Sequence, residues 1–202
     1  MSYPEFSLRK VQIDFQLKIV EESGLFAKAP NVEVSDYFVM TLQENLPLAV
    51  AINTEKARSE LIISEVLLEL RKRFDRKISF FSGIEFNVDK EKGLNGFCDF
   101  IVSLSPEQLF LKSPAIAIVE AKNENIMGGL GQCAAAMVAG QIFNQREENA
   151  IEAIYGAVTS GVAWKFLKLQ NDTLFIDLKD YNLEDRPEKV IGIFSATLDR
   201  NI

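Results

Sequence analysis

The sequence predicts an α/β protein with a central mixed β-sheet flanked by helices. Several apolar runs have the length of a strand and are separated by turn-prone segments, while other stretches repeat their apolar residues at helical spacing. The clearest strands lie within 96–104 and 114–122, and the clearest helix spans 54–74. Strands and helices that alternate along one chain favour a layered architecture around a single sheet.

The composition is that of one soluble globular domain, with 202 residues, 48% hydrophobic and 25% charged. We divide it into an N-terminal elaboration (1–53), a core (54–178) and a C-terminal helix (179–202). No apolar run approaches the roughly 20 residues that cross a bilayer, and the N-terminus lacks a signal-peptide pattern. Cys98 and Cys133 lie in apolar surroundings, which indicates buried thiols. These features predict a cytoplasmic protein without a membrane partner.

Histidine does not occur in the sequence. Its absence excludes His-based acid–base catalysis, Ser-His-Asp and Cys-His hydrolysis, and the usual zinc sites. A bound metal would therefore be held largely through oxygen, which favours Mg²⁺ or Mn²⁺. The formal charge of −7 counts against a protein that coats nucleic acid broadly, but a local basic track remains compatible with it.

Residues 1–53 carry conflicting signals. Ser7 suits the N-cap of a short helix, but the alternation of apolar residues from Val11 to Ile19 is typical of a strand. A short helix followed by an extended segment would satisfy both. A loop-rich stretch is expected next, because turn-forming residues recur along it: Gly24, Pro30, Asn31, Asn45 and Pro47.

The helix over 54–74 begins at Thr54, a favourable N-cap. At about 100° per residue, one polar stripe faces away from a broad apolar arc. The stripe comprises Arg58, Glu65, Glu69, Lys72 and Arg76. Glu60 falls instead within the apolar arc. An acid that points to the interior is costly unless paired or bound to metal, whereas an acid in the first turn can reach solvent and favour the helix dipole.

A dense basic run closes the same helix: Arg71, Lys72, Arg73, Arg76 and Lys77. One interpretation is a track for a phosphate backbone. The other is a solvated helix end whose cations complement the helix dipole.

Two apolar runs further along contain acidic residues. Three elements precede them, namely extended segments at 78–82 and 83–88 and a charged turn at 89–95. Asp99 interrupts the first run, and Glu120 closes the second, two positions before Lys122. Because side chains alternate along a strand, Glu120 and Lys122 project from one side, and a hairpin would bring Asp99 beside them.

Two carboxylates and an amine on rigid strands suit a hard divalent cation and an activated water. The alternative is that Asp99 is a solvated strand cap and that Glu120 and Lys122 form a surface charge pair. Sequence order places all three residues on neighbouring strands, which favours the site.

The remaining chain predicts further helices and strands. Three glycines after Lys122 indicate a flexible or close-approach loop, followed by an alanine-rich helix on the sheet. Gln132, in the first turn of that helix, would point towards the strand ends, although a glutamine there is usually a cap. Strands are expected at 151–159, 162–169 and 173–178, the last at an edge of the sheet, and a closing helix at 188–199.

This order of features resembles the PD-(D/E)XK nuclease superfamily, which has the restriction-endonuclease-like fold. An acid-bearing helix, strands with Asp99 and Glu120-Ala121-Lys122, and a helix with Gln132 match its motif, and the spacing from Asp99 to Glu120 is usual for it. The match covers Thr54 to Leu178. It departs where Ala136 stands in place of a tyrosine of some branches, and no proline precedes Asp99.

The resemblance implies a metal-dependent nuclease that hydrolyses phosphodiester bonds, with DNA as the expected substrate. It implies that Asp99, Glu120 and the carbonyl of Ala121 bind Mg²⁺ or Mn²⁺, and that Glu60 contacts the metal through water or binds a second ion. It further implies that Lys122 orients or deprotonates the attacking water. Gln132 would steady the substrate strand or Lys122.

Two other interpretations stay open. The first is a catalytically silent module that keeps the fold and serves nucleic-acid binding or assembly, which the acidic balance and Ala136 favour. The second is a purely structural domain that forms an oligomer, such as a homodimer, with Trp164 and the 173–178 edge strand at its interface. Trp164 can also stack on a base, although one aromatic residue in a strand is more often part of the core.

Overall fold

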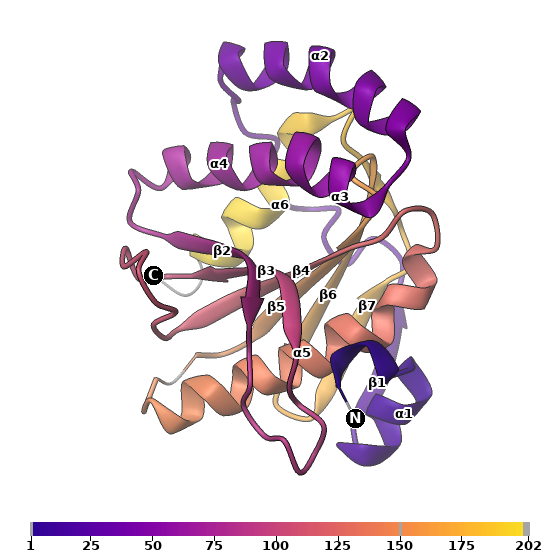
Figure 1. The fold of residues 1–202 in the computed structure, drawn as a ribbon, viewed down its shortest axis with the longest axis vertical. Coiled ribbons are helices and arrows are strands. Elements are labelled where there is room, and N and C mark those ends of the chain that lie inside the picture. Colours follow the sequence, from indigo (N-terminus) through magenta and orange to yellow (C-terminus); the bar gives the residue numbers. More distant parts are fainter. Residues whose placement is uncertain (1, 150, 200–202) are drawn as a thin grey trace.

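The computed structural model describes residues 2–149 and 151–199 and confirms an α/β protein with a mixed sheet flanked by helices (Figure 1). The sheet has eight strands in the order β1-β7-β6-β5-β4-β3-β2, and β8 pairs with β6 outside this path. The strands are β1 (Lys18–Glu22), β2 (Ser79–Glu85), β3 (Phe97–Ser103), β4 (Ala115–Ala121), β5 (Ile154–Thr159), β6 (Ala163–Gln170), β7 (Thr173–Asp177) and β8 (Tyr181–Asn182).

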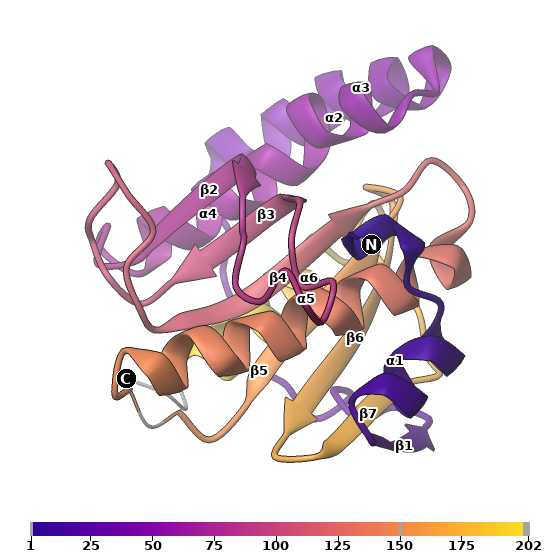
Figure 2. The same ribbon diagram turned by 60° about the horizontal axis from the view of Figure 1, so that its bottom comes forward.

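Helices cover both faces of the sheet. They are η1 (Tyr3–Glu5), α1 (Leu8–Asp14), α2 (Asp36–Ile52), α3 (Glu55–Arg58), the π-helical η2 (Ser59–Ile63), α4 (Ser64–Arg73), α5 (Ile126–Arg146) and α6 (Pro187–Asp199). One hydrophobic cluster joins α2, α4 and α6 to one face, and the other joins α1 and α5 to the opposite face. Figure 2 shows α5 lying across β4 and β5, with the N-terminal segment beside it.

The topology determines where the acidic strands end. β2, β3 and β4 form an antiparallel meander, whereas β4 and β5 are parallel. Parallel neighbours need a crossover connection, and α5 is that connection. The end of β4 therefore lies next to the start of α5, where the predicted site residues Glu120 and Gln132 can meet.

The N-terminal expectations are met in part. The predicted short helix and extended segment before residue 20 both occur, one after the other. Ser7 caps α1 by accepting a hydrogen bond from the Lys10 N–H, and β1 follows. The expected loop-rich stretch is wrong over α2. Its inward residues recur at helical spacing, namely Phe38, Leu42, Leu46 and Ala49. Pro47 lies inside this helix, so packing outweighs the lost backbone donor.

The polar stripe predicted over 54–74 is only partly exposed. Thr54 caps the helix as expected, but Arg58 and Glu69 are 6% and 7% exposed. The Glu69 carboxylate accepts hydrogen bonds from the Ser35 N–H and hydroxyl at 2.6 and 2.8 Å. Ser35 is the N-cap of α2, so this acid anchors the start of a helix that the sequence did not reveal.

The glycines after Lys122 lie within α5 and not in a loop. An added Cβ at Gly131 would lie 2.2 Å from the Phe6 carbonyl oxygen, so the N-terminal segment crosses the helix there. The expectation of close approach is thus correct, and the expectation of a flexible loop is wrong. The helix begins at Ile126, which moves Gln132 from the first turn to the second.

The expectation that no apolar segment has the length to cross a bilayer also needs correction. Within the described residues, α5 is long and apolar enough to do so by length and composition. However, 61% of its most apolar stretch is buried inside the protein. Its apolar surface packs on β4 and β5, so α5 is the core helix of a compact domain.

Two further expectations are corrected by the sheet order. The 173–178 segment forms β7, which is not at an edge because β1 pairs with it in parallel. Trp164 is fully buried, and its ring packs edge-on against Phe194 with a centroid distance of 5.6 Å. A buried ring is available neither for a dimer interface nor for stacking on a base. Cys98 and Cys133 are buried free thiols, as predicted.

Candidate active site

Asp99 and Glu120 lie side by side on the β3–β4 hairpin. Phe100 of β3 pairs with Val119 of β4, and the same register continued by one pair places Asp99 opposite Glu120. Asp99 Oδ2 accepts a hydrogen bond of 2.8 Å from the Ala121 N–H. This contact fixes the Asp99 carboxylate at the end of β4, on the face that Lys122 also occupies.

Glu120 and Lys122 form a close ion pair, as their spacing predicts. Lys122 Nζ donates a 2.6 Å hydrogen bond to Glu120 Oε1, and Glu120 is 2% exposed. Burial, together with the like charge of Asp99, raises the pKa of Glu120 to about 8. The ammonium of Lys122 opposes this rise but does not cancel it. Ionising both acids at once is therefore costly, even with the Lys122 ammonium beside Glu120.

Lys122 remains a cation in this setting. Burial acts to lower its pKa, but the neighbouring Glu120 carboxylate outweighs burial, and the pKa of Lys122 lies above its ordinary value. Its Nζ also donates to Gln132 Oε1 at 3.4 Å. Gln132 therefore joins the cluster from α5, in contact with Lys122.

Gly129 lies directly against the Lys122 side chain, a contact that the sequence did not assign to it. A Cβ at this position would lie 2.7 Å from Val158 Cγ1 and 3.0 Å from Lys122 Cε. The absence of a side chain lets α5 approach the lysine stem directly. The glycine-rich start of α5 was the available signal, since a glycine inside a helix marks close packing when no turn requires it.

We expect Gly129→Ala to destabilise the protein by about 1–3 kcal/mol, because the new methyl group must displace Val158 or Lys122. The matched control is Gly140→Ala in the same helix, where the added Cβ would meet Ile154 at an ordinary 3.7 Å. Urea unfolding of both variants measures the difference. Equal stability of the two would show that α5 does not pack on Lys122 as described.

Glu60 does not face the interior, contrary to the expectation from an ideal helix. It is exposed and lies 3.8 Å from the Lys56 ammonium. The cause is the π-helical turn Ser59–Ile63, which includes Glu60 and shifts the helix phase by one residue. Glu55, at the start of α3, is the helix acid whose charge acts on Lys122. Glu60 therefore reaches solvent, which is the alternative that the sequence left open for it, and it does not join Asp99 and Glu120.

Arg58 binds the segment that follows β4, which is another role that the sequence did not predict. It is buried, and its guanidinium donates to Asn123 Oδ1 at 3.0 Å, the Ser160 carbonyl at 2.7 Å and Asn53 Oδ1 at 2.9 Å. Asn123 directly follows Lys122, so Arg58 links α3 to the segment that carries the lysine. These three acceptors offset part of the free-energy cost of burying the guanidinium charge.

The donor set fits a hard divalent cation that keeps some of its water ligands. Asp99 and Glu120 supply oxygen, and a cation between them would offset the burial and the Asp99 charge that together raise the pKa of Glu120. Within residues 2–149 and 151–199, no group of three or more His, Cys, Asp or Glu side chains is placed to hold an ion. Mg²⁺ commonly binds through one or two carboxylates and retains waters, so two acids suffice.

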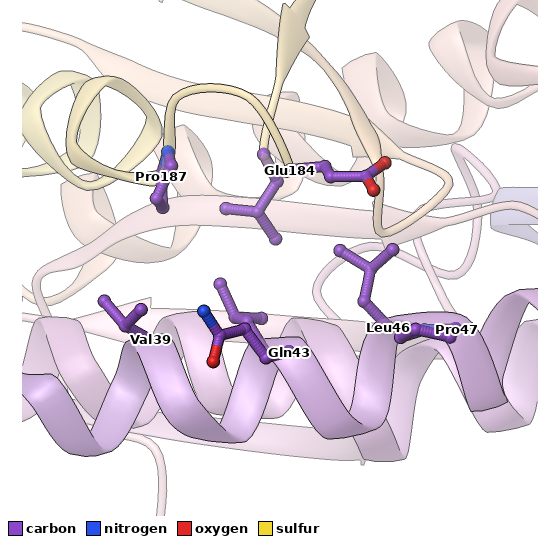
Figure 3. Close-up of a pocket in the computed structure, with 8 residues that line it drawn as sticks. Val39, Gln43, Leu46, Pro47, Glu184 and Pro187 are labelled. Carbon is purple, nitrogen blue, oxygen red and sulfur yellow. The ribbon is translucent and has the colours of Figure 1, made fainter.

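A separate cavity of about 280 Å³ lies between α2 and the segment before α6 (Figure 3). Val39 and Leu46 of α2 face Glu184 and Pro187 across it, and the lining is mostly apolar. The cavity is on the α2 face of the sheet, whereas Lys122 contacts α5 on the opposite face. It is therefore not part of the acidic site.

No protein-family model matches the sequence, and no curated protein is significantly similar to it. The resemblance to the PD-(D/E)XK nucleases depends on the residues and the geometry described above.

Proposed function

We propose that the protein is a metal-dependent nuclease of the PD-(D/E)XK type with a restriction-endonuclease-like core, acting on DNA in the cytoplasm. The observation that supports this most is the convergence of Asp99, Glu120, Lys122 and Gln132. Asp99 is fixed by the Ala121 amide, Glu120 by Lys122, and Lys122 by Gln132. Three consecutive elements, β3, β4 and α5, bring two acids, a cation and an amide to one place.

In this proposal Asp99 and Glu120, with the Ala121 carbonyl, hold Mg²⁺ or Mn²⁺. The ion supplies Lewis-acid activation of the phosphodiester and of water. The raised pKa of Lys122 keeps its ammonium charged at neutral pH, so it orients the attacking water and stabilises negative charge on the phosphate. This favours an electrostatic role for Lys122 over proton abstraction. Gln132 keeps the ammonium in place.

The test is Mg²⁺- or Mn²⁺-dependent cleavage of DNA by purified protein, with the wild type compared with Lys122→Ala and with EDTA as a control. Cleavage that needs the metal and the lysine supports the proposal.

A second candidate function is a catalytically silent module that binds nucleic acid or another protein chain. One observation favours it: with Glu60 turned outwards, Asp99 and Glu120 are the acids that the structure brings together. Such a module would keep the Glu120–Lys122 pair as a structural contact and would bind no metal.

A further inference from the structure

The outer side of α2 is apolar although it faces solvent. α2 packs on α3, η2 and α4 and lies farther from the sheet than α4 does (Figure 1). A surface helix of a soluble protein normally presents polar and charged residues to solvent. Among the described residues, however, five of the twelve exposed large apolar side chains belong to this helix of 17 residues, namely Tyr37, Met40, Leu48, Val50 and Ile52. Such a concentration of exposed apolar side chains indicates a binding surface.

This surface borders the cavity of about 280 Å³ beside α2 (Figure 3). Val39 and Leu46 line the cavity on the α2 side, and Pro187 lines it on the other. Pro47 also lines it, and at about 100° per residue Met40 lies next to Pro47 on the outward side of the helix. We call the cavity with this adjoining ridge the α2 groove. Its walls are a helix and a connecting segment, not the edge of a strand, so an occupant must satisfy its own backbone hydrogen bonds, as a helix does.

The charges around the α2 groove are negative. Asp36 and Glu44 are the charged residues of α2, and Glu184 lies on the opposite wall. All three side chains are exposed, and within the described part of the chain none of them forms an ion pair. The neighbouring cation Arg186 lines a different pocket and lies 3.7 Å from the Glu188 carboxylate. A partner that carries lysine or arginine around an apolar stripe therefore complements this surface.

The same charges disfavour a second copy of the chain and a membrane as occupants. Glu44 is exposed and lies at the midpoint of Asp36–Ile52, so in a symmetric antiparallel contact of two α2 helices it would meet its own copy. Two carboxylates at that place repel each other. A membrane surface is negatively charged and attracts basic helices, whereas α2 contains no lysine or arginine.

We infer that the α2 groove binds a basic amphipathic helix of a partner protein. Apolar side chains of that helix fill the cavity between Val39 and Pro187, and its lysine or arginine side chains pair with Glu184 and Glu44. Helices bind in this way through apolar residues at i, i+3 or i+4, and i+7. The interaction goes beyond the proposed nuclease activity and does not depend on it, because α2 packs on the face of the sheet opposite α5.

The test is binding of a fluorescein-labelled synthetic peptide of about 18 residues, or about five helical turns. Leucines at helical spacing form one stripe, and lysines occupy the other positions. Fluorescence anisotropy with the purified protein should show saturable binding. We expect Val39→Ala to weaken binding about fivefold, because it removes two methyl groups from the cavity wall. Glu184→Lys should weaken it about tenfold at low salt, because it reverses a charge at the rim.

Each variant has a matched control. Leu178→Ala shortens an exposed apolar side chain outside the groove, and Glu91→Lys makes the same change of net charge in the turn between β2 and β3. Both controls should bind the peptide like the wild type. A second peptide, with glutamates in place of the lysines, should bind at least about tenfold more weakly. Circular dichroism shows whether each variant is folded.

Equal losses for a variant and its control would overturn the inference, as would equally tight binding of the glutamate peptide. Sedimentation equilibrium of the protein alone tests for a second copy: dimers that Met40→Asp dissociates would overturn the inference in favour of self-association. Co-sedimentation with phosphatidylserine vesicles that Val39→Ala abolishes would overturn it in favour of a membrane.

Discussion

Replacement of Lys122 by alanine is expected to reduce metal-dependent cleavage of DNA by about 100-fold or more, the usual loss when a preorganised charge stabiliser is removed. The ammonium lies 2.6 Å from Glu120 and is held on α5 by Gln132. Its raised pKa keeps it positively charged where negative charge develops on the phosphate. The measurement is the cleavage rate of a labelled DNA in Mg²⁺ or Mn²⁺.

The matched control is Lys56→Ala, which removes an exposed lysine that pairs with Glu60. This variant should cleave at the rate of the wild type. Asp99→Ala should abolish cleavage, because it removes one of the two carboxylates of the site. Cleavage that survives both Lys122→Ala and Asp99→Ala in clean protein would contradict the nuclease proposal.

In metal-free protein, the Glu120 carboxyl is expected to make stability depend on pH. Its folded-state pKa of about 8 lies above the ordinary value of 4.5, so the native state binds the proton more tightly than the unfolded state. This contribution to stability is fully present below about pH 4.5 and is lost as the pH rises through about 8. Glu120→Gln removes it, because an amide does not ionise.

Urea unfolding in EDTA at acidic and alkaline pH measures this difference. Between about pH 5.5 and pH 8.5, the wild type is expected to lose on the order of 3 kcal/mol relative to Glu120→Gln. The other titrating groups are shared by both proteins and cancel in the comparison. Glu60→Gln, at an exposed position, should follow the wild type. Parallel profiles of the wild type and Glu120→Gln would show that the pKa of Glu120 is not raised in the folded protein.

Local patterns were sufficient to predict much of the sheet and the centre of the site. Strand alternation placed Glu120 and Lys122 on one side, and the hairpin brought Asp99 to them, as the hydrogen bonds show. These predictions succeeded because they depend on backbone geometry within and between two adjacent strands.

Features that depend on contacts distant in sequence were not predicted. The apolar stripe of α2 was hidden by Asn45 and Pro47, which read as turn residues but lie in a helix that packs on α4. A local irregularity was missed as well: the ideal helix phase placed Glu60 in the apolar arc because it does not anticipate a π-helical turn. The support that Arg58 gives to Asn123 joins positions far apart in the chain, and no local pattern marks such a contact.

The most direct test of the central claim is a calorimetric titration of the protein with Mn²⁺ at about pH 8.5, where Glu120 is largely ionised. The account predicts saturable binding that Asp99→Ala removes and that Glu60→Ala leaves unchanged. No heat of binding at millimolar Mn²⁺, or binding that persists in Asp99→Ala, would contradict a metal site at Asp99 and Glu120.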